Sequence, residues 1–374
     1  MEVFTHIILG TLLIYSVTII WFISGNLFSS APPNTHLHLP VSVVVAVRDG
    51  GNSLSRLLDA LSQQDYKGEM EFILVDDEST DNTSKLIKEK TAEDDRFILE
   101  SSTTGDFKLS RKKRALDAGI KIAQHEWLLF TDVDCLPPIS WVRSMAACFS
   151  EDSDFVVGSS VVPAGFNLIT WFQSMDFFLL MVAARGAIQA GRAWGSSGQN
   201  QAYRKSLYEK VGGFTDIYDE IQGDDSLFLQ ICRNKGKAKI HFNSSSEARV
   251  ISRQEKTIGG FLRQRIRWSG DANHMWKYNP VFYMAFAAAF LLSLGLTGLL
   301  LMGVTTNLIF LTVCVKIMFL KFILEFLLYF IGSRQLGEKM QFSHFCYWFL
   351  CHDLYISCMG IASFFAINLG WKRR

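Results

Sequence analysis

The chain has 374 residues, enough for one catalytic domain and several membrane-spanning helices but not for two large soluble domains. Its 37 Lys and Arg residues nearly balance 36 Asp and Glu residues, so its charge gives no reason to expect a nucleic-acid partner. The seven cysteines include no CxxC pair, which argues against a disulfide framework or a zinc ribbon and is typical of a reducing compartment.

The first predicted element is an apolar helix near the N-terminus. Residues 7–28 are mainly apolar, and no Asp, Glu, Lys or Arg occurs between Glu2 and Arg48. The segment is therefore long enough to cross a hydrocarbon core of about 30 Å. A signal peptide is the alternative, but Met1–His6 lacks the basic residues with which such a peptide begins. We predict an N-terminal transmembrane anchor over residues 1–30.

Alternating strands and helices are predicted for the middle of the chain. β-branched residues make Val41–Val47 a strand, and the leucines of 54–61 recur at helical spacing after it. Two further strands, Phe72–Val75 and Phe97–Leu99, flank a helix that begins after Ser79–Thr80–Asp81. This alternation is typical of a mostly parallel sheet with helices on its faces.

Acidic residues follow two of the predicted strands. Asp76–Asp77 follows the second strand, and a fourth strand, Trp127–Phe130, leads into Asp132 and Asp134. Open α/β sheets bind ligands at the carboxyl ends of their strands, so these carboxylates should converge on one crevice. On an extended segment, Asp132 and Asp134 point the same way, as a divalent cation requires. No GxGxxG follows the first strand and no GxxxxGK[ST] occurs, which argues against a dinucleotide dehydrogenase and a P-loop NTPase.

The C-terminal third is predicted to contain three transmembrane helices. Residues 278–331 are long and apolar enough for two helices that turn near Thr305–Asn307, and a third lies within 343–371. Lys321 and Glu325 have i,i+4 spacing inside the second helix, and a structural pair is favoured over a transport site. Just before these helices, basic and apolar residues alternate over 253–277, as in a helix at the membrane interface.

The sequence leaves open the environment of one apolar segment and the topology of the membrane spans. The apolar stretch Leu168–Ala184, which Asp176 interrupts, fits either a core helix or a membrane-facing helix, and we favour the second. Four spans place both termini on the same side of the membrane, yet Lys372–Arg373–Arg374 and the middle domain both favour the cytoplasm. The sequence therefore does not determine the exact number and topology of the spans.

Six motifs between Pro40 and Asp271 resemble those of family 2 glycosyltransferases with a GT-A fold. In chain order they are VSVVVAVRDGG, FILVDDESTDNT, LLFTDVDCLPP, GSSGQNQAYRKSLYEKVGGF, GDDSLFL and QRIRW. The last is similar to the QxxRW motif of the membrane-associated branch, which includes ceramide glucosyltransferases and the processive cellulose and hyaluronan synthases. The resemblance implies an α/β, Rossmann-like GT-A domain over residues 38–277, with transmembrane helices at both ends of the chain.

The resemblance also implies roles for individual residues. Asp132 and Asp134 would hold Mg²⁺ or Mn²⁺, whose charge stabilises the departing diphosphate. Asp225, or its neighbour Asp224, would be the catalytic base for the acceptor hydroxyl, although this pair replaces the more usual Glu-Asp. The nucleotide-sugar donor would be bound by Asp49, Asp77, Lys112, Asp132, Gln264, Arg267 and Trp268. The acceptor side of the pocket would include Gly198 and Asn200.

Lys112 has an alternative interpretation. Arg111, Lys113 and Arg114 are equally basic, so this part of the chain also fits a cationic helix face exposed to solvent.

The expected activity is that of an inverting glycosyltransferase (a hexosyltransferase, EC 2.4 class). It would move a sugar from a nucleotide-sugar, most simply a UDP-sugar, to a membrane-associated acceptor such as a lipid or saccharide. The expected location is the bacterial inner membrane, with the catalytic domain in the cytoplasm, where activated sugars are made. Neither the sugar, the acceptor nor the oligomeric state follows from the motifs, because pocket shape decides the first two.

Three alternative functions are considered. A processive polysaccharide synthase needs a channel for its product, for which four predicted spans are few. A catalytically inactive membrane scaffold would be expected to lose some of the carboxylates, whereas Asp77, Asp132, Asp134 and Asp225 are all present. A transporter is ranked last because the spans show no internal repeat.

Overall fold

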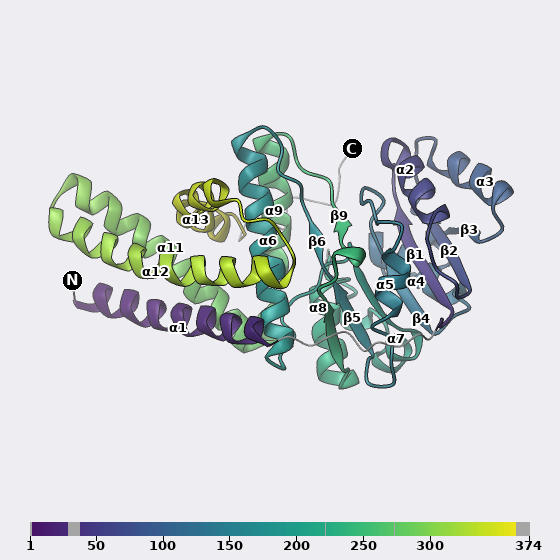
Figure 1. Ribbon diagram of the computed structural model, residues 1–374, viewed down its shortest axis with the longest axis horizontal. Coiled ribbons are helices and arrows are strands. Elements are labelled where there is room, and N and C mark those ends of the chain that lie inside the picture. The colour runs from purple at the N-terminus through teal and green to yellow at the C-terminus, as the bar shows by residue number, and fades with distance from the viewer. Residues whose placement is uncertain (1, 29–37, 221, 273, 364–374) are drawn as a thin grey trace. The chain divides into compact units, whose positions relative to one another are not determined.

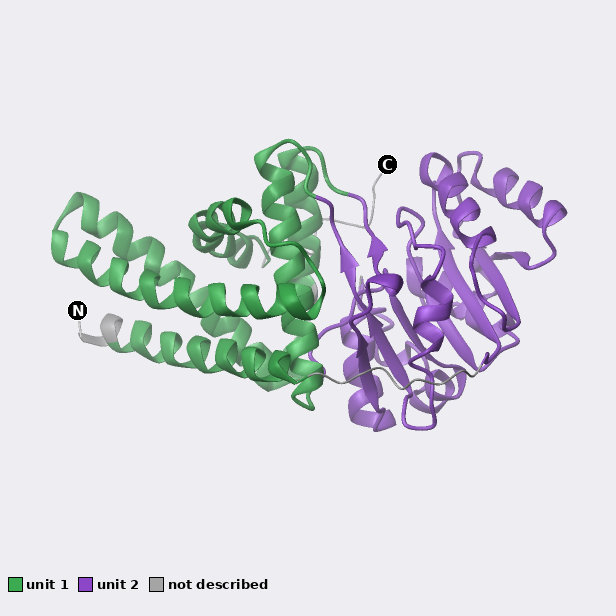
Figure 2. Ribbon diagram, in the orientation of Figure 1, with its two compact units in different colours: residues 1–29, 164–192, 254–374 green, residues 30–163, 193–253 purple. Residues whose placement is uncertain are grey.

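The computed structural model describes residues 2–28, 38–220, 222–272 and 274–363, and these form two compact units (Figures 1 and 2). Unit 1 comprises residues 1–29, 164–192 and 254–374, whereas unit 2 comprises residues 30–163 and 193–253. Parts of the predicted catalytic domain over 38–277 therefore group with unit 1, because its long apolar helices pack on one another.

A seven-stranded sheet forms the centre of unit 2, in the order β3-β2-β1-β4-β7-β5-β8. Only β7 is antiparallel to its neighbours, so the predicted mostly parallel sheet is confirmed. A separate two-stranded sheet pairs β6 with β9. The strands are β1 (Val41–Val47), β2 (Met70–Asp76), β3 (Phe97–Ser101), β4 (Trp127–Phe130), β5 (Phe155–Gly158), β6 (Ser160–Val161), β7 (Gln201–Arg204), β8 (Ile240–Asn243) and β9 (Val250–Ile251).

Helices pack on both faces of this sheet. One face buries Val43 and Val45 of β1 against leucines of α2 and Trp141 of α5. On the other face, a Cβ atom on Gly119 of α4 would lie 2.6 Å from Val44 Cγ1, so the helix can approach closely only with glycine there. Because strand residues alternate between faces, β1 is buried on both sides, which explains its continuous β-branched run. The helices of unit 2 are α2 (Gly51–Ser62), α3 (Thr83–Glu93), α4 (Arg111–Ile122), α5 (Trp141–Ala146), α7 (Lys205–Val211) and α8 (Ser226–Ile231).

Among the described residues of unit 1, all regular secondary structure is helical. Four helices are long and apolar enough to span a membrane, namely α1, α6, α11 and α13. The predicted turn near Thr305–Asn307 is confirmed, since α11 ends at Thr305 and α12 begins at Leu308. The helices are α1 (Glu2–Leu27), α6 (Leu168–Gln189), α9 (Ile258–Ala272), α10 (Met275–Tyr278), α11 (Pro280–Thr305), α12 (Leu308–Gln335) and α13 (Phe342–Ser363).

Two helices differ from the predicted set of spans. α12, expected to span, carries Lys316, Lys321 and Glu325 and is not among the four apolar helices. α6 is among them, but 67% of its most apolar stretch is buried, against 28% for α1 and α11. Helix α6 is therefore apolar enough to span a membrane and also largely buried. The last part of the third predicted C-terminal span, residues 364–371, and the basic residues 372–374 lie outside the described residues.

Polar side chains and glycines join the helices of unit 1. A Cβ atom on Gly25 of α1 would lie 1.9 Å from the carbonyl oxygen of Gly186 in α6, so the two backbones touch. Beside this contact, Asn26 is fully buried and donates to the Val182 carbonyl at 2.9 Å, while Arg185 donates to Asn26 Oδ1 at 3.0 Å. Small residues and interhelical hydrogen bonds are the means by which apolar helices associate when hydrophobic burial cannot drive them together.

A buried ionic cluster connects α1, α12 and α13. Lys321 Nζ lies 2.7 Å from Glu325 Oε1, which confirms the predicted structural pair, and 3.4 Å from Asp353 Oδ1. Tyr15 also donates a hydrogen bond to Glu325. The pair is thus part of a larger network that ties three helices together.

Candidate active site

The loops that follow β1, β2 and β4 open at the same edge of the sheet. β1 lies between β2 and β4, and all three strands are parallel. A Cβ atom on Gly50 would lie 2.8 Å from Val133 Cγ2, so the loop after β1 touches the loop after β4. The predicted convergence of acidic residues is therefore present in unit 2. These loops carry Asp49, Asp77, Asp132 and Asp134.

Asp49 and Asp77 are held in place by neighbouring loops. Asp49 Oδ1 accepts a hydrogen bond from the Thr80 backbone N–H at 2.8 Å, and this bond is the main cause that lowers the pKa of Asp49. Asp49 also has φ = +47°, which residues other than glycine rarely adopt. Asp77 is buried, and its Oδ2 lies 3.6 Å from Arg48 NH1. Sequence reasoning missed Arg48, although its position directly after a strand was a usable signal.

Lys112 joins two acidic loops through one ammonium group. Its Nζ lies 2.8 Å from Asp132 Oδ1 and 2.8 Å from Asp224 Oδ2. Burial alone would lower the pKa of Lys112, but the two carboxylates outweigh it and raise that pKa well above its usual value. The side chain therefore stays charged and links Asp132, one of the predicted metal-binding residues, to Asp224, the neighbour of the predicted base Asp225.

The basic neighbours of Lys112 have other partners. Lys113 is buried and donates hydrogen bonds to the carbonyl groups of Ile217 and Glu220, in the segment that precedes Asp224. Arg114 donates to the Thr103 carbonyl at 3.1 Å. A solvent-exposed cationic face, the alternative interpretation of this segment, is therefore wrong for Lys112 and Lys113.

Asp225 is a partly buried carboxylate at the N-terminus of α8. Its Oδ1 accepts a hydrogen bond from the Ser226 backbone N–H, and its Oδ2 accepts one from the Gly198 N–H at 3.4 Å. Burial, and then the negative charge of Asp224, raises the pKa of Asp225 to about 6. A carboxyl with a pKa near neutrality is suited to accept a proton during a reaction.

Gly198 lies beside the charged groups, whereas Asn200 does not face them. A Cβ atom on Gly198 would lie 3.0 Å from Lys112 Nζ and 3.1 Å from Asp224 Oδ2, so only glycine leaves these side chains undisturbed. Asn200 is fully buried, and its amide accepts a hydrogen bond from the Trp141 indole at 2.9 Å. The same amide donates to two backbone carbonyls, so direct contact with an acceptor would require these bonds to break.

The carboxylates after β4 fit a divalent cation. One ligand atom each from Asp132, Asp134 and Cys135 lies within 4.8 Å of the other two. Burial, together with the charges of Asp132 and Asp134, raises the pKa of the Cys135 thiol well above its usual value, so the thiol stays protonated and is a poor ligand. The two carboxylates remain, and oxygen ligands are those that Mg²⁺ and Mn²⁺ prefer.

The segment of the chain that carries these acidic loops matches the sequence profile of a known protein family. Residues 42–212 match the sequence profile of "Glycosyl transferase family 2". Over these residues the chain is similar to family 2 glycosyltransferases. The match begins in β1 and ends just after α7, so it includes the loops with Asp49, Asp77, Asp132 and Asp134.

Two curated relatives are glycosyltransferases of greater length than this chain. The chain is 25% identical over 238 residues to a poly-beta-1,6-N-acetyl-D-glucosamine synthase of Staphylococcus epidermidis, covering 61% of this chain and 53% of the relative. It is 26% identical to the probable glycosyltransferase YdaM of Bacillus subtilis strain 168, covering 61% of this chain and 54% of that protein. The chain thus spans about half the length of these relatives.

A solved structure shares the fold over nearly the whole chain. It is the mannosyltransferase PcManGT from Pyrobaculum calidifontis, solved in complex with GDP-Man and Mn²⁺, with 18% identity and a TM-score of 0.64. The alignment covers 97% of each chain. At this identity the likeness shows the fold alone, and it confirms the predicted GT-A fold with helices at both ends.

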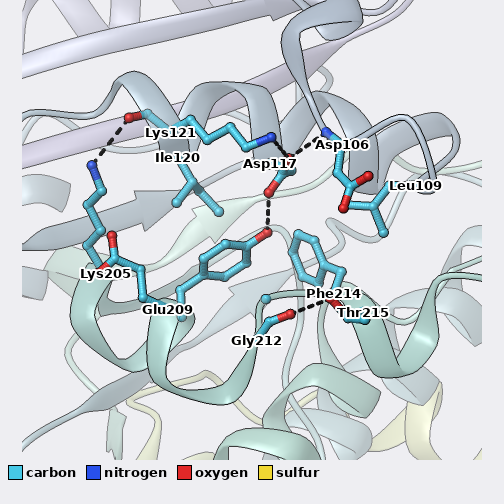
Figure 3. A pocket seen from close by; sticks show the side chains of 12 residues that line it. Asp106, Leu109, Asp117, Ile120, Lys121, Lys205, Glu209, Gly212, Phe214 and Thr215 are labelled. Atoms are coloured by element: carbon cyan, nitrogen blue, oxygen red, sulfur yellow. Dashed lines mark hydrogen bonds and ion pairs between the residues drawn. The ribbon is translucent and has the colours of Figure 1, made fainter.

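A pocket of about 420 Å³ lies elsewhere in unit 2, between α4, α7 and the segment after α7 (Figure 3). Its central acid, Asp117, accepts hydrogen bonds from the Asp106 N–H at 2.7 Å and the Tyr208 hydroxyl at 2.8 Å, and pairs with Lys121 at 2.8 Å. None of the predicted site residues of the glycosyltransferase domain lines it. Because this acid is already paired, we do not assign the pocket a role in catalysis.

The remaining predicted residues lie on α9 of unit 1. Gln264, Arg267 and Trp268 are each partly buried there, and their role in donor binding stays a prediction. Arg265, which sequence reasoning gave no separate role, is only 3% exposed and pairs with Asp176 at 3.2 Å. No sequence spacing signals this pair, because its two members are far apart along the chain.

Proposed function

We propose that the protein is an inverting glycosyltransferase that moves a sugar from a nucleotide-sugar to a membrane-associated acceptor. One observation carries the proposal, namely that Lys112 bridges Asp132 and Asp224. This single side chain connects the carboxylate pair that fits a divalent cation to the acidic pair that contains a base of suitable pKa. Glycosyl transfer from a sugar diphosphate needs both functions close together.

Donor binding would use the loops at the edge of the sheet. Asp49 and Asp77 lie after β1 and β2, where the resemblance places contacts with the base and ribose of the nucleotide. Asp132 and Asp134 would hold Mg²⁺ or Mn²⁺, which when bound offsets the negative charge of the diphosphate leaving group. The Mn²⁺ and GDP-Man bound to PcManGT support this class of donor and ion.

Lys112 would assist the same leaving group. The permanently charged ammonium can exchange a carboxylate partner for a donor phosphate oxygen, because both are anionic oxygens. The exchange would free Asp132 for the metal ion and bring positive charge to the diphosphate.

Asp225 would serve as the general base. Its carboxylate takes the proton of the acceptor hydroxyl while that oxygen bonds to the anomeric carbon and the bond from carbon to the diphosphate breaks. Attack opposite the leaving group inverts the anomeric configuration, so no covalent sugar–enzyme intermediate is needed. Asp224 is the alternative base, but its Oδ2 is occupied by Lys112.

The acceptor is proposed to be a lipid or a lipid-linked saccharide. The four helices that are long and apolar enough to span a membrane support a membrane location, and the glycosyltransferase domain would face the cytoplasm of a bacterial cell. A processive polysaccharide synthase is the second candidate, because the relatives from Staphylococcus epidermidis are named poly-beta-1,6-N-acetyl-D-glucosamine synthases. Single transfer and processive synthesis share the same donor chemistry and differ in their products.

The test is a donor screen on the purified full chain in detergent with Mn²⁺. UDP-N-acetylglucosamine, UDP-glucose and GDP-mannose are supplied with and without extracted membrane lipids, and nucleotide release and product mass are measured. We expect release of one nucleotide diphosphate, with a lipid carrying one sugar. A ladder of sugar additions would favour the synthase, and neither binding nor release with any donor would overturn the proposal.

A further inference from the structure

A buried ion pair underlies α9 in unit 1. Arg265 NH2 lies 3.2 Å from Asp176 Oδ2, and the two side chains are 3% and 8% exposed. Asp176 lies in the middle of α6, in an otherwise apolar stretch where an unpaired charge would be costly. Its other oxygen, Oδ1, accepts a hydrogen bond from the indole of Trp348 on α13 at 3.3 Å. Helices α6, α9 and α13 therefore meet at one carboxylate.

The arginine of this pair also lies against Trp268. The guanidinium carbon of Arg265 is 4.3 Å from the centre of the Trp268 ring and 5.2 Å from that of Phe261. A planar guanidinium over an aromatic face is attracted to it, and the attraction is strongest for tryptophan. Phe177 of α6 is a further aromatic neighbour of Trp268, with ring centres 6.0 Å apart. The indole thus has a fixed charged neighbour on one side.

The position of that neighbour depends on Asp176. An arginine side chain has many rotamers, and burial alone does not select the one that stacks on Trp268. The carboxylate of Asp176 selects it, because Arg265 can satisfy its buried charge only by reaching toward α6. Within unit 1 the orientation of the Trp268 indole is therefore coupled to an acid 92 positions earlier in the chain.

We propose that Asp176 is a positioning residue that acts through Arg265 to hold the indole of Trp268. The proposal rests on the proposed function and on the prediction that Trp268 helps to bind the nucleotide-sugar donor. Asp176 touches no substrate in this account. Its loss should mainly lower kcat, because it leaves Asp132, Asp134 and Lys112, which are proposed to act on the diphosphate, unchanged.

A double substitution separates positioning from simple structural support. Asp176→Leu leaves Arg265 buried without a partner, so the variant should be less stable. Asp176→Leu combined with Arg265→Met removes both charges, and such replacements often keep or improve stability. If the pair only supports the fold, the double variant should recover both stability and activity. If the pair positions Trp268, it should recover the melting temperature but not kcat, which we expect to stay roughly 10- to 100-fold low.

Two reference variants complete the kinetic test. Arg263→Met removes an exposed arginine from the same helix and should leave kcat and KM near wild-type values. Arg265→Lys keeps the charge but not the planar stack, so it should restore stability more than activity. Rates are measured with whichever of UDP-N-acetylglucosamine, UDP-glucose and GDP-mannose the wild type uses fastest. Full activity in the stable double variant would overturn the proposal.

A spectroscopic measurement tests the positioning without any activity. The full chain is labelled with 5-fluorotryptophan, and the fluorine resonance of Trp268 is identified by its absence in Trp268→Phe. Asp176→Asn should shift or broaden this resonance and that of Trp348, while most of the other seven tryptophans stay unchanged. An unmoved Trp268 resonance would refute the positioning role. A shifted resonance in a protein whose Trp268→Ala variant transfers sugar normally would instead refute the role of Trp268 in the proposed function.

Discussion

The two units each contain a lysine between two carboxylates, and the clusters differ mainly in exposure. In unit 2, Lys112 contacts Asp132 and Asp224, and the Asp132 side chain is 27% exposed. In unit 1, Lys321 contacts Glu325 and Asp353, with side-chain exposures of 1%, 2% and 10%. The same combination of charges is open to a ligand in one unit and sealed in the other.

This difference separates a binding function from a structural one. A partly exposed ion pair contributes little net stability, so its partners can be exchanged for ligand groups at small cost. A fully buried pair has lost its hydration, and removal of one member leaves a charge that nothing else neutralises. Exposure, more than residue type, is therefore the reason why we propose a role in catalysis for the first cluster and a role in helix packing for the second.

The largest expected effect is on the carboxylates that fit the metal ion. Asp134→Ala should reduce sugar transfer to background, because the remaining carboxylate cannot hold the ion that neutralises the diphosphate. Thermal unfolding without metal should be almost unchanged, since Asp134 is exposed. Rates are measured with Mn²⁺ added back after chelation.

Asp95→Ala is the matched control for that variant, because it removes an exposed aspartate after α3 and should transfer sugar normally. Full turnover by chelated wild-type protein would show that Asp132 and Asp134 do not act through a metal ion.

The next effect concerns Asp225, the partly buried acid at the start of α8. Asp225→Asn keeps the shape of the side chain but cannot accept a proton, so transfer should fall by about 10²–10⁴. UDP affinity, measured by calorimetry on the same preparation, should change far less, because the donor is held by other residues. Near wild-type transfer would move the role of base to Asp224, and Asp224→Asn is the variant that would then lose activity.

Lys112→Met should lower kcat by roughly 10²-fold, the effect of losing one group that stabilises the leaving diphosphate. It also leaves Asp132 and Asp224 without their shared counter-ion, so the melting temperature should drop modestly. Because a metal ion can replace this counter-ion at Asp132, added Mn²⁺ should restore part of the stability. A normal kcat in the Lys112→Met variant would show that Lys112 has only a structural role, as is proposed for Lys321.

The pH dependence of kcat should report the raised pKa of Asp225. A general base works only when deprotonated, so activity should be constant above about pH 7 and fall as the pH drops below about 6, approaching tenfold per pH unit. The profile is recorded with saturating donor. If kcat instead began to fall only near pH 4, the pKa of the Asp225 carboxyl during turnover would have its ordinary value.

Much of unit 2 could be predicted because local patterns and tertiary structure agree there. β1 and β4 have the predicted ends, since both are short apolar runs buried in the sheet. β2 was predicted too short because its second residue, Glu71, is charged. That carboxylate is buried, and it accepts hydrogen bonds from Ser42 at 2.5 Å and from the Gln124 N–H at 2.7 Å. Only the neighbouring strand and loop explain a glutamate at this position.

Other features depend on contacts between distant segments and have no local signal. The antiparallel strand β7 is polar at both ends, and its place between β4 and β5 follows from pairing alone. The separate roles of Lys112 and Lys113 could not be read from a run of four basic residues. The structure separates them, since adjacent residues on a helix point in different directions. Asp176 was noted only as a break in an apolar segment.

The smallest expected effect on activity, and the sharpest contrast with Lys112, is at the sealed cluster of unit 1. Lys321→Met leaves Glu325 and Asp353 buried without a cation, so stability should fall by about 3–5 kcal/mol, the usual cost of breaking a buried pair. Molecules that remain folded should transfer sugar at the wild-type rate, because no residue of this cluster is proposed to touch donor or acceptor. The measurement pairs the melting temperature in detergent with kcat per folded molecule.

Lys316→Met is the control for this prediction. It removes a lysine from the same helix that makes no ion pair among the described residues, and it should change neither the melting temperature nor kcat. A large fall in the kcat of Lys321→Met with an unchanged melting temperature would show that burial does not distinguish Lys321 from Lys112, and the sealed cluster would need a role in transfer.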